Sequence, residues 1–145
     1  MTCLPDVNVW LALAVDEHTH HGAARLWESQ LSTELLVFCR TTELGLFRLL
    51  TNARVMNDAP LTAAQAWSVR DRIFDDPRVS LIAEPRHFDE HWRRTARAGK
   101  IGPHFWTDAY LATLCAATDC TLITFDRKLA RSKKCSTHLL EATAV

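Results

Sequence analysis

The sequence predicts a single α/β domain over residues 1–145, with a mostly parallel central sheet flanked by helices. Short apolar runs that resemble buried strands alternate along the chain with segments of helical periodicity. Strands that alternate with helices imply a parallel sheet covered on both faces. The chain is long enough for one full hydrophobic core, and no repeat or linker divides it.

Five short apolar segments are the expected strands. The first is Cys3-Leu4 with its flanks. The other four cover residues 35–38, 79–83, 121–125 and 136–140, and the last of these is expected to be an edge strand.

The helices are expected between these strands. Residues 7–15 are too continuously apolar for a surface helix and should be buried. In residues 22–32, Ala23, Leu26, Trp27 and Leu31 share one face. Four further amphipathic helices are expected. They cover residues 41–50, which begin with Thr-Thr-Glu, residues 62–75, which begin at Thr62, the Arg-rich residues 87–98, and the segment whose apolar stripe follows Asp108.

Composition indicates a globular protein without a membrane span, since no apolar run is long enough to cross a bilayer. The N-terminus has no basic segment ahead of an apolar one, so we expect no signal peptide. Five cysteines without a CxxC pair favour reduced thiols in the cytoplasm over disulfides or zinc. The formal net charge is zero, but residues 127–134 hold five of the seventeen Lys and Arg residues and no acid. This tract is either a polyanion-binding surface or a solvated turn.

Four acids that are far apart in sequence are predicted to meet. Asp6 and Asp126 each follow a strand, and Glu43 and Asp108 each lie in or near the first turn of a helix. In an open α/β sheet these positions share one edge, where ligands bind. Helix N-termini stabilise a carboxylate by only about 0.3–1 kcal/mol, so a cluster needs further neutralisation. Oxygen-rich sites select Mg²⁺ or Mn²⁺. Without a nucleotide-binding Gly-rich loop, such a site favours hydrolysis of phosphate esters.

Several motifs together resemble the PIN-domain ribonucleases, and more narrowly the VapC toxins of bacterial toxin–antitoxin pairs. The resemblance covers nearly the whole chain and is weakest over residues 132–145. It is carried by Leu4 to Leu13, by His18 and His21 before Ala24 and Trp27, by Thr107 to Ala112, and by Leu122 to Arg127.

The resemblance implies a Mg²⁺- or Mn²⁺-dependent endoribonuclease that leaves 5′-phosphate and 3′-hydroxyl ends. It also implies a homodimer and a cognate antitoxin that inserts a segment across the active site. Asp6, Glu43, Asp108 and Asp126 match the catalytic acids of the family. Asp6, Asp108 and Asp126 are the expected metal ligands, and Glu43 acts through water or a second cation. Asn8, Thr107 and Thr124 match polar positions that orient the acids.

One departure from the family lies between the helix that starts near Asp108 and the next strand. The family commonly has Gly in this turn, whereas here the residues are Asp119-Cys120. Asp tolerates left-handed backbone conformations better than most residues, so we expect the turn to survive.

Simpler interpretations stay open for individual residues. Each acid alone could be a helix cap or an exposed side chain. His18, His20 and His21 are better explained by packing or helix entry than by zinc. Trp106, with Phe105, could stack an RNA base or belong to the core. The helices at 22–32 and 62–75 could add a dimer or antitoxin surface to their core role. Basic residues that could contact phosphates are Arg93, Arg94, Arg97, Lys100, Arg127, Lys128 and Arg131.

Other functions are compatible with parts of this sequence. A non-catalytic RNA- or protein-binding module is the main alternative, although a binding module gains nothing from repelling acids. A DNA-directed nuclease also remains open, because metal-assisted hydrolysis does not need the 2′-hydroxyl. A receiver domain lacks its paired acids here, and a haloacid-dehalogenase-type phosphatase would need an acid where Asn8 stands.

Overall fold

The computed structural model describes residues 1–142 and has the predicted α/β architecture. All five expected strands are present, within one or two residues of the predicted bounds. The strands are β1 (Thr2–Pro5), β2 (Leu35–Phe38), β3 (Val79–Leu81), β4 (Thr121–Thr124) and β5 (Thr137–Leu139). The helices are α1 (Val7–Ala14), α2 (His21–Ser29), α3 (Arg40–Leu50), α4 (Ala63–Phe74), α5 (Phe88–Thr95), α6 (Phe105–Thr118) and α7 (Arg127–Arg131).

The strands form one parallel sheet in the order β3-β2-β1-β4-β5. β1 lies at the centre and pairs with β4 in a register that sets Pro5 beside Ile123. The amide of Asp6 donates to the carbonyl of Ile123 at 2.9 Å and extends this ladder by one residue. The residues that follow β1 and β4 are therefore neighbours in space.

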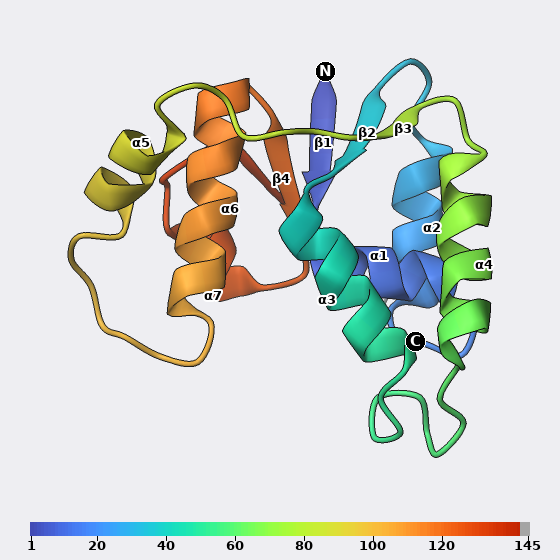
Figure 1. Ribbon diagram of the computed structural model, residues 1–145. Coiled ribbons are helices and arrows are strands. Elements are labelled where there is room, and N and C mark those ends of the chain that lie inside the picture. Colours follow the sequence, from blue (N-terminus) through green and yellow to red (C-terminus); the bar gives the residue numbers. More distant parts are fainter. Residues whose placement is uncertain (143–145) are drawn as a thin grey trace.

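Both faces of the sheet are covered, which explains why its strands are continuously apolar. Neighbouring residues of a strand point to opposite faces. Leu36 and Phe38 pack with α1, α2, α3 and α4, whereas Val37 packs with α5, α6 and α7. Figure 1 shows these two helical layers on either side of the sheet.

The chain leaves the centre of the sheet in opposite directions. After β1 it crosses one face through α1 and α2 to β2, and after β3 it crosses the other face through α5 and α6 to β4 (Figure 1). The switch point between β1 and β4 is where an open α/β sheet forms a crevice at its carboxyl edge. Asp6 and Asp126 follow the two strands at this point.

Local features of the helices agree with the sequence in most places. The Thr62 side chain accepts a hydrogen bond from the Gln65 amide at 3.2 Å and caps α4. α6 ends at Asp119, whose φ of 54° confirms the expected left-handed turn. One position predicted on an apolar helix face is wrong, because Leu26 is 52% exposed.

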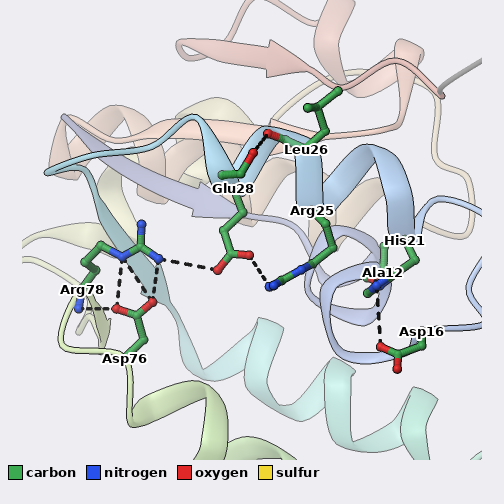
Figure 2. A network of polar contacts seen from close by, with 9 residues as sticks. Ala12, Asp16, His21, Arg25, Leu26, Glu28, Asp76 and Arg78 are labelled. Atoms are coloured by element: carbon green, nitrogen blue, oxygen red, sulfur yellow. Dashed lines mark hydrogen bonds and ion pairs between the residues drawn. The ribbon is translucent and has the colours of Figure 1, made fainter.

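An ion-pair network joins α2 to the segment between α4 and β3. Glu28 lies between two guanidinium groups, with its carboxylate 2.5 Å from Arg25 Nη1 and 3.6 Å from Arg78 Nη2 (Figure 2). Arg78 also pairs with Asp76 at 2.7 Å. This network fixes the outer layer on the side of the sheet opposite α6. Within residues 1–142, no helix has both the length and the apolar character that spanning a membrane requires.

Candidate active site

Asp6 is held rigidly at the carboxyl end of β1. It caps α1, and its Oδ1 accepts a hydrogen bond from the Val9 amide at 3.0 Å. Its Oδ2 accepts a hydrogen bond from the Thr124 hydroxyl. Asp6 is only 6% exposed, so both oxygens have protein donors in place of bulk water.

Asp126 and Asp108 come from the elements on either side of β4. Asp126 caps α7, and its Oδ1 accepts from the amides of Lys128 at 2.8 Å and Leu129 at 3.2 Å. Asp108 lies in the first turn of α6 and is half-buried. α6 thus carries a carboxylate at its N-terminal end, where the helix dipole favours negative charge.

These three acids border one cavity of about 410 Å³, which we call the acidic cavity. It lies against the start of α1, the inner side of α3, and the N-terminal ends of α6 and α7. Its lining includes Asp6, Val7, Asn8, Thr41, Thr42, Gly45, Arg48, Leu49, His104, Thr107, Asp108, Leu111, Asp126 and Leu129.

The electrostatics of the acidic cavity favour proton or cation uptake. Burial raises the pKa of Asp6 from 3.8 to about 6, and the charge of Asp126 adds to the shift. Burial and the charge of Asp126 also raise the pKa of Asp108. The positive charges of His104 and Lys128 oppose the increase at Asp108. The three carboxylates therefore interact through space as like charges.

Glu43 lies in the first turn of α3, directly after β2 as expected, but it is not among the residues that line the acidic cavity. Its buried carboxylate pairs with Arg40 of the same helix turn and with Arg70 Nε of α4 at 3.3 Å. The Arg70 guanidinium also lies 3.7 Å from the centre of the Phe74 ring. Because two arginines neutralise Glu43, it joins α3 to α4. Its participation in catalysis stays a prediction.

The three remaining acids fit a hard divalent cation by their chemistry. All are carboxylates, and burial together with the nearby charge of Asp126 raises the pKa of Asp6 and of Asp108, so a cation would stabilise their charged forms. Within residues 1–142, no three His, Cys, Asp or Glu side chains are close enough to hold an ion by protein groups alone. Mg²⁺ usually keeps several waters and binds through one or two carboxylates, so this spacing is compatible with it.

The predicted orienting residues differ in what they contact. Thr124 is fully buried and bridges two acids, since its hydroxyl donates to Asp6 and its oxygen accepts from the Asp126 amide at 3.0 Å. Asn8 and Thr107 are exposed and line the acidic cavity.

The predicted RNA contacts separate into two groups. Lys128 lines a second cavity beside the acids, whereas Arg127 and Trp106 line neither of these two cavities. Trp106 is 56% exposed, so the alternative that it belongs to the core is wrong.

The histidine cluster has the packing role that the sequence favoured. His21 Nδ1 is 2.7 Å from the Ala12 carbonyl, which ties the start of α2 to the end of α1. The His20 ring stacks on Phe125 with centroids 4.6 Å apart.

Sequence reasoning missed several residues that line these cavities. Thr41, Gly45 and Arg48 are spaced four and three residues apart and face the acidic cavity from one stripe of α3. Extending the helical period from Thr41 would have found this stripe and left Glu43 outside it. His104 and Lys134 have no comparable local signal, because loops bring them to the site.

Comparisons with known proteins identify the family and the fold. Residues 3–134 match the PIN domain family. The chain is 39% identical to Ribonuclease VapC41 of Mycobacterium tuberculosis over 128 residues, covering 85% of this chain and 88% of the relative. It is 33% identical to Ribonuclease VapC39 of the same organism over 141 residues, which cover 91% of this chain and 94% of the relative.

Solved structures share the fold at lower identity. The Mycobacterium tuberculosis toxin VapC20, described as cleaving the sarcin-ricin loop, superimposes with a TM-score of 0.65 at 17% identity and covers 90% of this chain and 95% of its own. VapBC2 from Rickettsia felis, bound to a promoter DNA fragment, superimposes with a TM-score of 0.65 at 14% identity. The match covers 97% of this chain and 100% of that chain. The family match, the curated relatives and the sheet order agree: the chain belongs to the PIN-domain family and, within it, groups with the VapC proteins.

Proposed function

We propose that this protein is a Mg²⁺- or Mn²⁺-dependent endoribonuclease and the toxin of a type II toxin–antitoxin pair. The observation that carries the proposal is the acidic cavity, where carboxylates from three distant segments border one space at the switch point of the sheet. The ribonuclease names of relatives that are 33–39% identical support the choice of RNA as substrate.

The roles of individual residues follow from their contacts. Asp6, Asp108 and Asp126 would hold the cation, in part through bound water, and the cation would supply Lewis-acid polarisation of the phosphoryl oxygen and activation of the attacking water. Thr124 fixes the orientation of Asp6, and the first amides of α7 fix Asp126. Asn8 and Thr107 face the same cavity and orient water or substrate. The products are fragments with 5′-phosphate and 3′-hydroxyl ends.

A cognate antitoxin is part of the proposal. Solved VapBC assemblies from Rickettsia felis and Haemophilus influenzae share this fold and support such a partner. An Arg or Lys of the antitoxin entering the acidic cavity would neutralise its carboxylates. Leu26 on α2 and Trp67 on α4 are exposed apolar side chains, which suit an antitoxin or homodimer contact. The free state of all five cysteines is consistent with a cytoplasmic protein.

The test compares three Asp→Asn variants on total bacterial RNA, with and without Mg²⁺ or Mn²⁺. Asp6→Asn and Asp108→Asn should abolish cleavage because each removes a cation ligand. Asp119→Asn is the matched control, since it changes an exposed acid at the far end of α6 and should cleave like the wild type.

Two outcomes would contradict the proposal. Full activity of folded Asp6→Asn and Asp108→Asn would remove these acids from the mechanism. No cleavage by the folded wild type, on total RNA or on a panel of defined tRNAs, would favour the non-catalytic binding module. Matched RNA and DNA oligonucleotides then separate a ribonuclease from a DNA-directed enzyme.

A further inference from the structure

A second cavity of about 190 Å³ adjoins the acidic cavity, and we call it the lysine recess. Three lysines line it: Lys100 from the loop before α6, Lys128 from α7, and Lys134 from the loop before β5. The two cavities share His104, Asp108, Asp126 and Leu129. The acids proposed to hold the cation therefore lie between the acidic cavity and the recess.

The lysines of the recess are available to a ligand. None of the three lysines forms an ion pair with an acid within residues 1–142, whereas several arginines of the protein do. Lys134 is anchored by a hydrogen bond from its Nζ to the Thr95 carbonyl at 3.3 Å, which links the loop after α7 to α5. Phe105, Ala109 and Ala112 form an apolar part of the wall, where charges are less screened than in open water.

The basic tract at residues 127–134 divides into two sets. Lys128 and Lys134 line the recess, whereas Arg127, Arg131 and Lys133 do not. All five side chains are exposed. The sequence alone presents them as one run of charge, but the structure selects two of them by position.

We propose that the lysine recess binds a backbone phosphate of single-stranded RNA, next to the phosphate hydrolysed in the acidic cavity. This rests on the proposed function for its substrate. RNA carries a phosphate at every nucleotide, so a strand that presents one to the acids presents the next one nearby. The recess is the cationic space that adjoins these acids. Lysine is suited to this task, because its ammonium binds phosphate as a compact point charge.

The experiment measures binding and needs no cleavage, so it stays informative even if the protein is not a nuclease. Every variant carries Asp108→Asn, and a short fluorescent single-stranded RNA is titrated by anisotropy at several salt concentrations. The test variant is Lys128→Gln with Lys134→Gln. The matched control is Arg127→Gln with Lys133→Gln, which removes the same charge from the same tract outside the recess.

Loss of the one phosphate contact in the recess should reduce the slope of log affinity against log salt by about 0.7, which is the contribution of one contact in a single strand. The same change weakens binding about 5-fold at 0.1 M salt. The control variant should change the affinity by much less, as should the test variant with an RNA whose linkages are uncharged methylphosphonates.

Three results would overturn the proposal. Equal weakening by the test and control variants would show that the tract acts as diffuse charge. Unchanged affinity in the test variant would show that RNA follows another path. The same loss with methylphosphonate RNA would show that the lysines contact something other than phosphate. Equal urea midpoints for all variants would exclude misfolding as the cause.

Discussion

The hydroxyl of Thr124 donates a hydrogen bond to Oδ2 of Asp6, which precedes it by 118 positions in sequence. The same hydroxyl oxygen accepts from the Asp126 amide at 3.0 Å. One buried side chain thus sets the orientation of one acid and the backbone of another.

Thr124→Val keeps the shape of the side chain and removes both hydrogen bonds. A buried carboxylate that loses its donor costs about 1–3 kcal/mol, so we expect a decrease of that size in the free energy of unfolding at pH 7.5. Thr121→Val is the matched control on the same strand. Its hydroxyl makes only an exposed contact with Ser136 at 3.3 Å, and its loss should cost below about 0.5 kcal/mol. Equal effects of the two changes in urea unfolding would contradict the prediction.

The raised pKa of Asp6 makes stability depend on pH. Its pKa is about 6 in the folded protein against an ordinary value of 3.8, so between these values the folded state holds a proton that the unfolded state has lost. Stability should therefore fall as pH rises through this range, by up to about 3 kcal/mol from this residue. Asp108 acts in the same direction.

Urea unfolding in the presence of a chelator, from pH 4.5 to 7.5, tests this pH dependence. Asp6→Asn should be more stable than the wild type at pH 7.5, and the difference should shrink to about a third by pH 4.5. Burial lowers the pKa of His18, which makes stability rise with pH and opposes the trend from Asp6. This effect is the same in both proteins, so the difference in stability between them is the quantity to compare. A pH-independent difference would contradict the raised pKa.

Glu43→Gln should destabilise the contact between α3 and α4. It leaves the half-buried Arg70 with only the exposed Asp71, at 3.5 Å, as a charged partner, and we expect a loss of about 1–3 kcal/mol. Arg40→Gln is the control, because Arg40 is largely exposed and should cost below about 1 kcal/mol. Cleavage is measured at a temperature where all variants are folded. A loss of activity without a loss of stability would place Glu43 in the mechanism and not at the helix interface.

Gly45→Ala should strain the crossing of α1 and α3. A Cβ at this position would lie 2.9 Å from Cγ2 of Val7, which is too close for real side chains. Overpacking costs about 1–3 kcal/mol, against a gain of about 1 kcal/mol in helix propensity, so we expect a net loss of about 1 kcal/mol. The same change in a Val7→Ala background should be stabilising. A loss of equal size in both backgrounds would exclude this contact as the cause.

Asp119→Gly should stabilise the end of α6. Asp119 adopts φ 54° and ψ 43°, which Gly adopts without a Cβ penalty. Its negative charge also lies at the unfavourable end of the helix dipole. We expect a gain of about 0.5–1 kcal/mol in thermal unfolding, and a loss for Asp119→Val, whose branched side chain resists this conformation. A lower melting temperature for the Gly variant would contradict this account.

Much of the fold could be predicted from the sequence because its determinants are local. Apolar strands between amphipathic helices gave the correct strands, and the position of Asp6 and Asp126 directly after strands fixed their place at one edge. The alternation of Leu36, Val37 and Phe38 between two faces needs only the period of a strand.

The remaining features depend on partners that local patterns do not reveal. Glu43 turns toward Arg70, which lies 27 positions later on another helix. Lys128 and Arg127 are adjacent in sequence, yet only Lys128 lines the recess, because α7 is a single short turn whose direction is set by packing of Leu129. The exposure of Leu26 likewise follows from how α2 lies on the sheet.

The pairing of β1 with β4 also sets the order in which the acidic cavity can be assembled during synthesis. Asp6 is made more than a hundred residues before its neighbours Thr124 and Asp126. A nascent chain that ends before β4 therefore has an unsupported Asp6 and no acidic cavity. The cavity can form only after β4 and the start of α7 have been synthesised and have docked beside β1.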